Sequence, residues 1–350
     1  MVDNNYGLAI VGLGGMGNWH REFIETIEGL TVVGINDIKE ERRQFARDNN
    51  VHVYGTLEEL LNDDRVDIVL VTTPNDVHKE ISIKALRAGK NVVCEKPAML
   101  SSKELEEVMQ VSKETGKLFV VHQNRRWDED FLTIKEIYNK NLLGDIYNIE
   151  SRVHGSRGIP GDWRQEKEHG GGMLLDWGVH ILDQMLFMIH EKVKKVYCKF
   201  NHVTNELVDD GFKIILTFES GKTALLEVGT SNFINLPRWY VLGLNGSAVI
   251  NDWNLDGKIV RVKNWEDKDA VPIRAASGLT KTMAPRLDNT IFEEELPIQK
   301  SDLREYYRNV MAVIEGKAEV IVKNTEVLRV MKLMEACFMS DEKQTVVDFE

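Results

Sequence analysis

The feature that most constrains this chain is a glycine-rich turn near its N-terminus. Gly12-Leu13-Gly14-Gly15-Met16-Gly17 follows an apolar run at residues 8–11 and opens a helical pattern. In that setting the first glycine makes the tight turn, the second lets the backbone approach a pyrophosphate, and the third lets helix and strand pack closely. The first amides of the helix then bind the anion. The motif predicts a dinucleotide site; a tight turn without a ligand is the alternative.

Asp37 indicates which dinucleotide the turn prefers. It lies about twenty residues past Gly17, where a carboxylate hydrogen-bonds the adenosine ribose hydroxyls and repels a 2′-phosphate. The residue therefore favours NAD over NADP. Lys39, Arg42 and Arg43 leave acceptance of a phosphate open, and a surface turn residue is the other interpretation of Asp37.

The first 120 or so residues alternate short apolar runs with helical patterns, which is typical of a parallel sheet. Thr56 with Glu59, and Ser101 with Glu104, have the spacing of capping boxes at helix starts. We expect strands at residues 8–11, 31–35, 66–71, 91–94 and 118–121.

From about residue 146 the pattern changes to strands joined by turn dipeptides, which predicts an antiparallel sheet. One helix, at 173–188, interrupts it after three glycines. The expected turns are Ser220-Gly221, Asn245-Gly246 and Asp256-Gly257, and the expected closing elements are helices at 303–314 and 325–339 and a strand at 345–349. The fold class is therefore α/β, with a doubly wound parallel domain at 1–124 and a second α/β domain at 125–350.

Bulk composition agrees with two domains and narrows the partners. With 350 residues, 43% of them hydrophobic, the chain exceeds the roughly 250–300 residues at which single cores stop growing. The net charge of −12 has no basic run beside it, which argues against nucleic acid as a partner. The polar N-terminus has no secretory pattern, and the apolar run at 8–11 is shorter than the about 20 residues that span a bilayer. We expect a cytoplasmic protein without a membrane partner, whose three cysteines are buried thiols.

Two predicted strand ends carry residues suited to a cofactor site. Thr72-Thr73-Pro74-Asn75 follows one strand and Cys94-Glu95-Lys96-Pro97 follows another. Ligands of open α/β sheets lie outside the carboxyl ends of the strands, so both segments should face the dinucleotide. Lys96, held before a proline, would place an ammonium there; a solvated loop lysine is the alternative.

Asp176 and His180 complete a candidate catalytic set. They stand at i and i+4 of the predicted helix, on one face, and Asp183 continues that stripe one turn later. Oxidation of an alcohol needs a base for the hydroxyl proton, which a histidine can supply, while an ammonium stabilises the alkoxide. Two alternatives stay open: a structural pair, and a metal site completed by His169 or His154. No metal is expected, because a full ligand set is not evident.

Taken together, these motifs resemble the Gfo/Idh/MocA oxidoreductase family, which includes glucose-fructose oxidoreductase and inositol 2-dehydrogenase. The likeness covers nearly the whole chain. It comprises the glycine loop with His20, Thr73-Pro74-Asn75 with His78, Ala88-Gly89-Lys90 before Glu95-Lys96-Pro97, Asn124-Arg125-Arg126, Gly144-Asp145-Ile146, residues 170–180 and the helix at 324–340.

The resemblance implies a Rossmann domain followed by a domain with a large open antiparallel sheet, often used for homodimers or homotetramers. The helix at 324–340 would pack back on the Rossmann domain. It also implies site residues: Lys96, Asp176 and His180 as catalytic; Thr73, Pro74, Asn75, His78, Glu95 and Lys96 beside the cofactor, with Gly12, Gly14, Gly15, Met16, Gly17 and Asp37; and Arg126, Trp163 and Arg164, with Asp176 and His180, around the substrate.

The expected substrate is a sugar, glycoside or cyclitol that exchanges a hydride with nicotinamide at a secondary alcohol carbon. Gly161-Asp162-Trp163-Arg164 and Trp177 resemble the branch that oxidises C3 of glucosides. Two other functions remain as alternatives: cleavage of a glycoside through transient oxidation by NAD, and a non-catalytic NAD-binding regulator.

Overall fold

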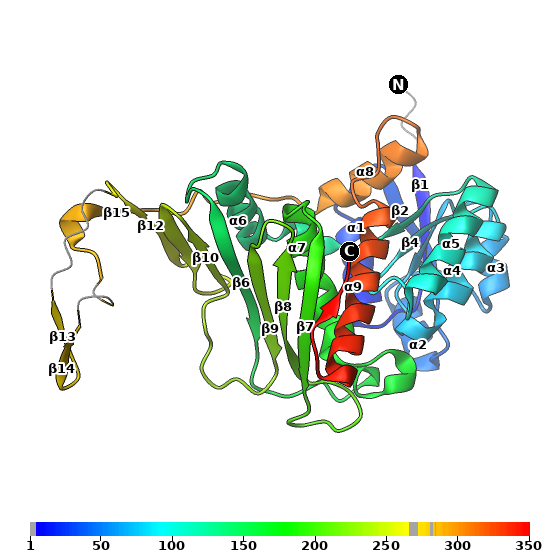
Figure 1. Ribbon diagram of the computed structural model, residues 1–350. Coiled ribbons are helices and arrows are strands. Elements are labelled where there is room, and N and C mark those ends of the chain that lie inside the picture. Colours follow the sequence, from blue (N-terminus) through cyan, green and yellow to red (C-terminus); the bar gives the residue numbers. More distant parts are fainter. Residues whose placement is uncertain (1–4, 266–271, 281–282, 284) are drawn as a thin grey trace.

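Two sheets organise the molecule, as the computed structural model shows (Figure 1). The structure describes residues 5–265, 272–280, 283 and 285–350. The first four residues, part of the N-terminus used in the expectation about location, lie outside this set. In the described part, no helix is long and apolar enough to cross a membrane.

The N-terminal sheet has five parallel strands in the order β2-β1-β3-β4-β5. All five strands predicted from the apolar runs are present. The central residues of four of them are buried, because helices cover both faces, and the middle of the edge strand β2 is half-buried. The strand order reverses between β1 and β3, and ligands of such sheets bind at that point. The strands are β1 (Tyr6–Val11), β2 (Leu30–Asn36), β3 (Ile68–Val71), β4 (Asn91–Cys94) and β5 (Phe119–Val121), and the helices are α1 (Gly15–Ile24), α2 (Glu40–Asp48), α3 (Leu57–Leu61), α4 (His78–Arg87) and α5 (Ser102–Thr115).

Both predicted helix starts are present, but the hydrogen bonds at the second differ from those of a capping box. The capping box of Thr56 and Glu59 forms as expected. At Ser101 the hydroxyl accepts the N–H of Glu104, but the Glu104 carboxylate accepts from the N–H of Leu100, so the reciprocal bond of a capping box is replaced by one to the preceding residue. The sequence spacing identifies the cap and leaves open which of two adjacent amides the carboxylate meets.

The second sheet has nine strands in the order β15-β12-β11-β10-β6-β9-β8-β7-β16. Its neighbours are antiparallel as predicted, except that β6 pairs with β9 in parallel. The sheet is therefore mixed. A helix and two strands separate β6 from β9 along the chain, and β9 runs in the same direction as β6. Its strands are β6 (Ile146–His154), β7 (Val193–Asn201), β8 (Gly211–Phe218), β9 (Thr223–Gly229), β10 (Trp239–Gly243), β11 (Gly246–Ile250), β12 (Gly257–Val262), β15 (Ile291–Glu294) and β16 (Val347–Asp348), and a separate hairpin joins β13 (Ile273–Ala275) to β14 (Gly278–Thr280).

Helices cover one face of the nine-stranded sheet and leave the other open. α6 (Glu129–Asn139), α7 (Val179–Met188) and α9 (Asn324–Lys343) pack on it, and α9 lies between this sheet and the N-terminal domain (Figure 1). The Glu335 carboxylate on α9 accepts bonds from Ser102 at the start of α5. α8 (Arg304–Ile314) brings two buried tyrosines to the N-terminal domain. The division of the chain at residue 124 stays a prediction.

Three buried cysteines are free thiols. Cys198 on β7 and Cys337 on α9 are far apart in the sequence, yet their side chains share a hydrogen bond, which together with burial raises the pKa of Cys198. Cys94 is buried at the end of β4. The expectation of buried thiols is thus confirmed, although two of them are neighbours.

The helix expected at residues 173–188 is in two parts. Residues Leu174–Gly178 form a π-helical turn, and α7 follows it. Asp209 holds the start of this turn: its carboxylate accepts the N–H of Leu174 at 2.8 Å, and its carbonyl accepts the N–H of Met173 at 2.9 Å. A π turn widens the local backbone and is frequent at functional sites. Asp176 lies within it.

Gly172, just before the π turn, should not tolerate a side chain. Its φ is +102°, and a Cβ there would lie 2.2 Å from Oδ1 of Asp209. We expect Gly172→Ala to lower the free energy of unfolding by about 2–4 kcal/mol, from left-handed strain and the clash. Denaturant unfolding measures this. Gly161→Ala is the control, because a Cβ at Gly161 meets nothing within 4 Å; equal losses in both variants would contradict the prediction.

Candidate active site and dinucleotide site

The glycine turn has the shape that a pyrophosphate site needs. Gly12 has a φ of +96°, and a Cβ on it would lie 2.9 Å from the carbonyl oxygen of Thr72. A Cβ on Gly17 would lie 2.1 Å from the carbonyl oxygen of Gly12, so helix α1 and strand β1 approach too closely for any side chain. Gly15 has open space at the position of its Cβ, and Met16 is partly exposed. The amides that begin α1 are therefore accessible, and the turn fits a dinucleotide.

Asp37 lies at the end of β2 beside this turn. Its carboxylate accepts the N–H of Leu13 at 2.7 Å and that of Lys39 at 2.8 Å, and it contacts Arg42 at 3.3 Å. The Arg42 guanidinium extends over the turn, 3.7 Å from where a Cβ of Gly14 would be. An acid suited to ribose hydroxyls and a cation suited to a 2′-phosphate thus lie side by side.

This pair should control the choice of dinucleotide. We expect Asp37→Ser to weaken NADH binding and Arg42→Ala to weaken NADPH binding, each about tenfold, the effect of one charge-assisted hydrogen bond. Fluorescence titration gives both dissociation constants. Arg43→Ala is the control, since Arg43 pairs with Glu40. Equal changes for the two dinucleotides in either variant would show that the pair does not discriminate.

His78, which was expected beside the cofactor, contacts the backbone of two loops through its two ring nitrogens. It is fully buried; Nδ1 lies 3.0 Å from the carbonyl oxygen of Pro97 and Nε2 lies 3.0 Å from that of Thr73. Asn75 is also occupied: its side chain donates to the carbonyl of Gly170 at 2.9 Å, across to the second domain. Both side chains therefore hold the loops at the strand ends through backbone contacts, and contact of these residues with the cofactor stays a prediction.

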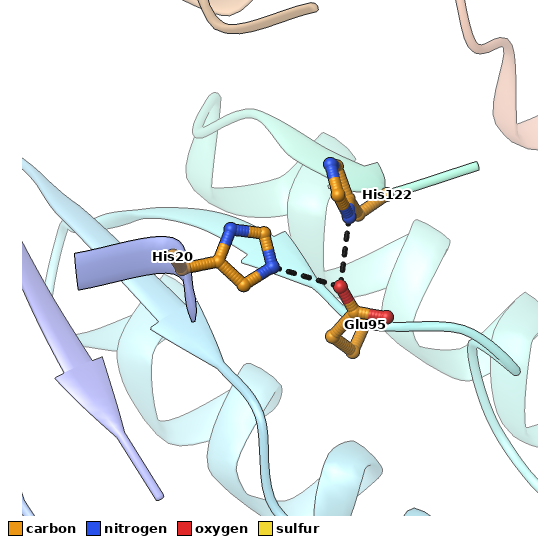
Figure 2. A group of neighbouring side chains, drawn as sticks. All are labelled: His20, Glu95 and His122. Carbon is orange, nitrogen blue, oxygen red and sulfur yellow. Dashed lines mark hydrogen bonds and ion pairs between the residues drawn. The ribbon is translucent and has the colours of Figure 1, made fainter. Parts of the chain in front are cut away.

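The other residues of these two loops differ in whether their side chains have hydrogen-bond partners. The hydroxyl of Thr73 is buried without a hydrogen-bond partner among the described residues, and Pro74 is half-buried beside it. The side chain of Glu95 is buried between two histidines (Figure 2), and its contact with the cofactor stays a prediction. Thr73 therefore remains the side chain of this set that is available to a ligand.

Lys96 and Asp176, eighty residues apart, meet as expected. The lysine Nζ lies 3.0 Å from Oδ1 of Asp176 and 3.1 Å from its carbonyl oxygen. Arg164 approaches the same carboxylate from the other side, with Nε 3.3 Å from Oδ2. Burial opposes ionisation of Asp176, but these two cations hold its pKa below the usual value. Asp176 is thus an anion fixed between a lysine and an arginine.

His180 lies one turn beyond Asp176 and is buried. Its Nδ1 has no hydrogen-bond partner among the described residues. Burial, reinforced by the positive charges of Lys96 and Arg125, lowers the pKa of His180 well below 6.5. The imidazole is therefore neutral at neutral pH, and a neutral imidazole can accept a proton.

His169 and His154, considered above as further ligands of a metal site, lie beside other acidic residues. His169 lies 3.2 Å from Asp76 and 3.3 Å from Glu166, and His154 lies 3.8 Å from Glu227. Neither forms a ligand cluster with Asp176 and His180 in the described part of the chain.

A cavity of about 490 Å³ adjoins Asp176. Trp177 from the π turn and Trp253 from the loop before β12 contribute indole rings to it. The Arg125 guanidinium lies over both, 4.1 Å from the first ring and 5.5 Å from the second. An aromatic wall with charged donors suits a ring that carries hydroxyl groups. Trp253 was missed from the sequence, where a tryptophan in a polar turn was its one signal.

Arg126 is held by protein partners while its neighbour Arg125 lines the cavity, and substrate binding by Arg126 stays a prediction. Arg126 is buried and donates to Asp183 at 2.8 and 2.7 Å and to Glu326 at 2.7 Å. Asp183 consequently belongs to this ion pair and does not continue the catalytic stripe. Trp163 lies beneath the guanidinium of Arg164, 4.7 Å from ring centre to Cζ, and Arg164 reaches Asp176.

Comparison with known proteins agrees with this geometry. Residues 6–123 match the model of the oxidoreductase family with an NAD-binding Rossmann fold, and residues 131–249 match that of the GFO/IDH/MocA C-terminal domain. The chain belongs to the Gfo/Idh/MocA family. It is an NAD(P)-dependent dehydrogenase of that family, which confirms the resemblance found in the sequence.

Relatives span the full chain. An NAD-binding protein from Listeria innocua superposes with a TM-score of 0.96 at 47% identity over 99% of each chain. The scyllo-inositol 2-dehydrogenase (NADP+) of Bacillus subtilis is 29% identical over 351 residues, 97% of this chain and 95% of the relative. The myo-inositol 2-dehydrogenase of Thermotoga maritima is 26% identical over 227 residues, 63% and 67% of the two chains.

Proposed function

We propose that this family member oxidises a secondary alcohol carbon of a cyclitol or sugar, or reduces the corresponding ketone, with NAD as the preferred dinucleotide. The observation that carries the proposal is the contact of Lys96 with Asp176 beside a cavity with aromatic walls, with a buried, neutral His180 one helical turn further on. Two relatives named as inositol 2-dehydrogenases support the substrate class.

The side chains divide the chemistry among them. His180 takes the hydroxyl proton as general base, since its lowered pKa leaves it neutral. The Lys96 ammonium stabilises the alkoxide that forms on the same oxygen. Asp176, ionised between Lys96 and Arg164, orients the lysine and accepts from a neighbouring substrate hydroxyl. The glycine turn and Asp37 would hold the dinucleotide, whose nicotinamide would supply the acceptor for the hydride that leaves the carbon.

The cavity suggests how the substrate is held. A ring packed on Trp177 and Trp253 would expose its hydroxyls to Arg125 and Asp176. C3 of a glucoside is the finer proposal for the reacting carbon, and it rests on the resemblance of Gly161-Asp162-Trp163-Arg164 to the branch that oxidises this position.

A substrate panel tests the function. The purified protein is incubated with NAD or NADP and with inositols, free sugars and methyl glucosides, while reduced nicotinamide is followed by absorbance and products by mass spectrometry. Loss of two hydrogens matched by NADH supports the proposal. Release of an aglycone without net NADH supports glycoside cleavage instead, and tight NAD binding without turnover supports a regulator.

We also infer a cytoplasmic homodimer or homotetramer. The uncovered face of the nine-stranded sheet carries exposed Ile215 and Tyr240, which lie in one row across the strands and which a second copy would bury. Light scattering after size exclusion measures the mass; a monomer at micromolar concentration contradicts the inference.

A further inference from the structure

A buried polar cluster lies directly behind the catalytic lysine. It consists of His20 on α1, Glu95 after β4, His122 after β5 and Tyr307 on α8. The side chains of both histidines are fully buried and that of Glu95 is 6% exposed. Both imidazole rings point at the same carboxylate (Figure 2).

Hydrogen bonding assigns a role to each ring nitrogen. Oε1 of Glu95 lies 2.8 Å from Nε2 of His20 and 2.7 Å from Nδ1 of His122. A carboxylate oxygen can only accept, so both nitrogens carry the proton. Nδ1 of His20 must then accept, and the hydroxyl of Tyr307, 2.7 Å away, donates to it. Oε2 of Glu95 accepts the backbone N–H of Lys96 at 3.1 Å.

The carboxylate of Glu95 is ionised. Burial alone would raise the pKa of Glu95, but His122 and His20 hold it well below its usual value. Burial lowers the pKa of His20 to about 4, so that ring is neutral at neutral pH. An ionised carboxylate is thus held from three sides, one of them the backbone of the catalytic lysine.

These hydrogen bonds also connect Glu95 to helix α1, which begins at the dinucleotide site. His20 stands three residues after Gly17, in the helix whose first amides face the pyrophosphate. Movement of α1 therefore changes the position of Glu95, and with it the peptide of Lys96. The ammonium of Lys96 must reach Asp176 at 3.0 Å, so small displacements matter.

We propose that Glu95, clamped by His20, His122 and Tyr307, is a positioning residue that fixes Lys96 and couples dinucleotide binding at α1 to the placement of the lysine ammonium. The inference rests on the proposed dehydrogenase function. In this proposal the Glu95 side chain interacts with the backbone of Lys96 and with the two histidines.

A metal ion is the competing occupant, because two histidines and a glutamate are a common ligand set. The geometry favours hydrogen bonds: both nitrogen–oxygen distances are those of direct N–H to carboxylate bonds, and the second nitrogen of His20 is occupied by Tyr307. Elemental analysis of the purified protein separates the two, and one equivalent of a transition metal would overturn the proposal.

Glu95→Gln is the main test. The amide keeps the shape but must turn an NH₂ group towards either the histidines or the N–H of Lys96. We expect kcat to fall about tenfold or more, which is the effect of losing a charge-assisted hydrogen bond. The KM for the alcohol substrate should change less than threefold. NADH titration should show a lower affinity, since α1 is coupled to Glu95; unchanged affinity together with unchanged kcat would overturn the proposal.

The pH profile tests whether Glu95 is ionised beside the catalytic residues, as the proposal requires. The charged groups and histidines facing His180 are Lys96, Arg125, Glu95 and His122, and among them the Glu95 carboxylate raises the pKa of His180. In Glu95→Gln that pKa falls, so the acid limb of kcat/KM moves to lower pH. An unmoved limb would count against the proposal.

Adjacent tyrosines supply a matched pair of variants. Tyr307→Phe removes the donor to His20, whereas Tyr306→Phe removes a buried hydroxyl that has no hydrogen-bond partner among the described residues. We expect Tyr307→Phe to lower kcat about fivefold, the effect of about one neutral hydrogen bond, and Tyr306→Phe to leave it unchanged. Equal effects of the two variants would overturn the proposal.

Nitrogen-15 NMR of labelled histidines tests the cluster without turnover. His20 should be protonated at Nε2 and His122 at Nδ1, and both signals should shift in Glu95→Gln. The opposite tautomers would overturn the clamp even in a protein with a confirmed substrate. The assigned tautomers in a protein that turns over no polyol would reject the proposed function and leave the clamp standing.

Discussion

Replacing Lys96 by methionine is expected to lower kcat by about 10²–10³, the usual cost of removing one donor from a developing oxyanion. Methionine keeps the apolar stem and removes the ammonium that lies 3.0 Å from Asp176. Asp176 retains Arg164, so its carboxylate stays paired. Steady-state rates on the substrate found by the panel measure the loss, and NADH titration should show binding within threefold of the wild type.

Lys90→Met is the control for this variant. Lys90 precedes the same strand, β4, at its opposite end, where Nζ donates to the carbonyl of Asp63. Removal of that amine should affect stability and leave kcat unchanged. A Lys96→Met enzyme with kcat close to the wild type would remove lysine from the mechanism.

Replacing His180 by asparagine is expected to lower kcat/KM for alcohol oxidation by about 10²–10⁴, the usual contribution of a general base. In the wild type, burial with Lys96 and Arg125 nearby lowers the pKa of His180 well below 6.5. The base is active when neutral, so kcat/KM should stay level through neutral pH and fall as the pH drops through that lowered pKa. Rates measured from acid to neutral pH give this limb, which His180→Asn should lose.

His190→Asn is the matched control, because His190 is exposed just beyond the end of α7, the helix that carries His180. It should retain both the rate and the acid limb. If His180→Asn kept an acid limb at the wild-type pH, another group would be the base.

Local patterns were enough for the N-terminal fold. Each parallel strand is a continuous apolar run, and β4 was predicted with the bounds it has. The glycine turn was also readable, because the φ of +96° at Gly12 and the contact of Gly17 with the carbonyl of Gly12 both lie within one strand–turn–helix unit. Such contacts depend on residues close in sequence, so the pattern itself contains them.

Side-chain direction was harder to predict. Arg125 and Arg126 are adjacent on the short 3₁₀ helix Asn124–Trp127, where successive side chains diverge; one lines the cavity and the other is buried with Asp183. Nothing in the dipeptide says which. His78 and Glu95 likewise follow strands β3 and β4, and their side chains contact protein partners that the local pattern does not indicate.

The sequence by itself determined the α/β class, the dinucleotide turn and the three candidate catalytic residues, because residue type and short-range spacing carry that information. Tertiary structure decided the rest: the π turn that displays Asp176, the cavity wall of Trp177 and Trp253, and the clamp around Glu95. These features join segments up to nearly three hundred residues apart, such as His20 and Tyr307. Their distances are set by how the two sheets and their helices pack, which no local pattern encodes.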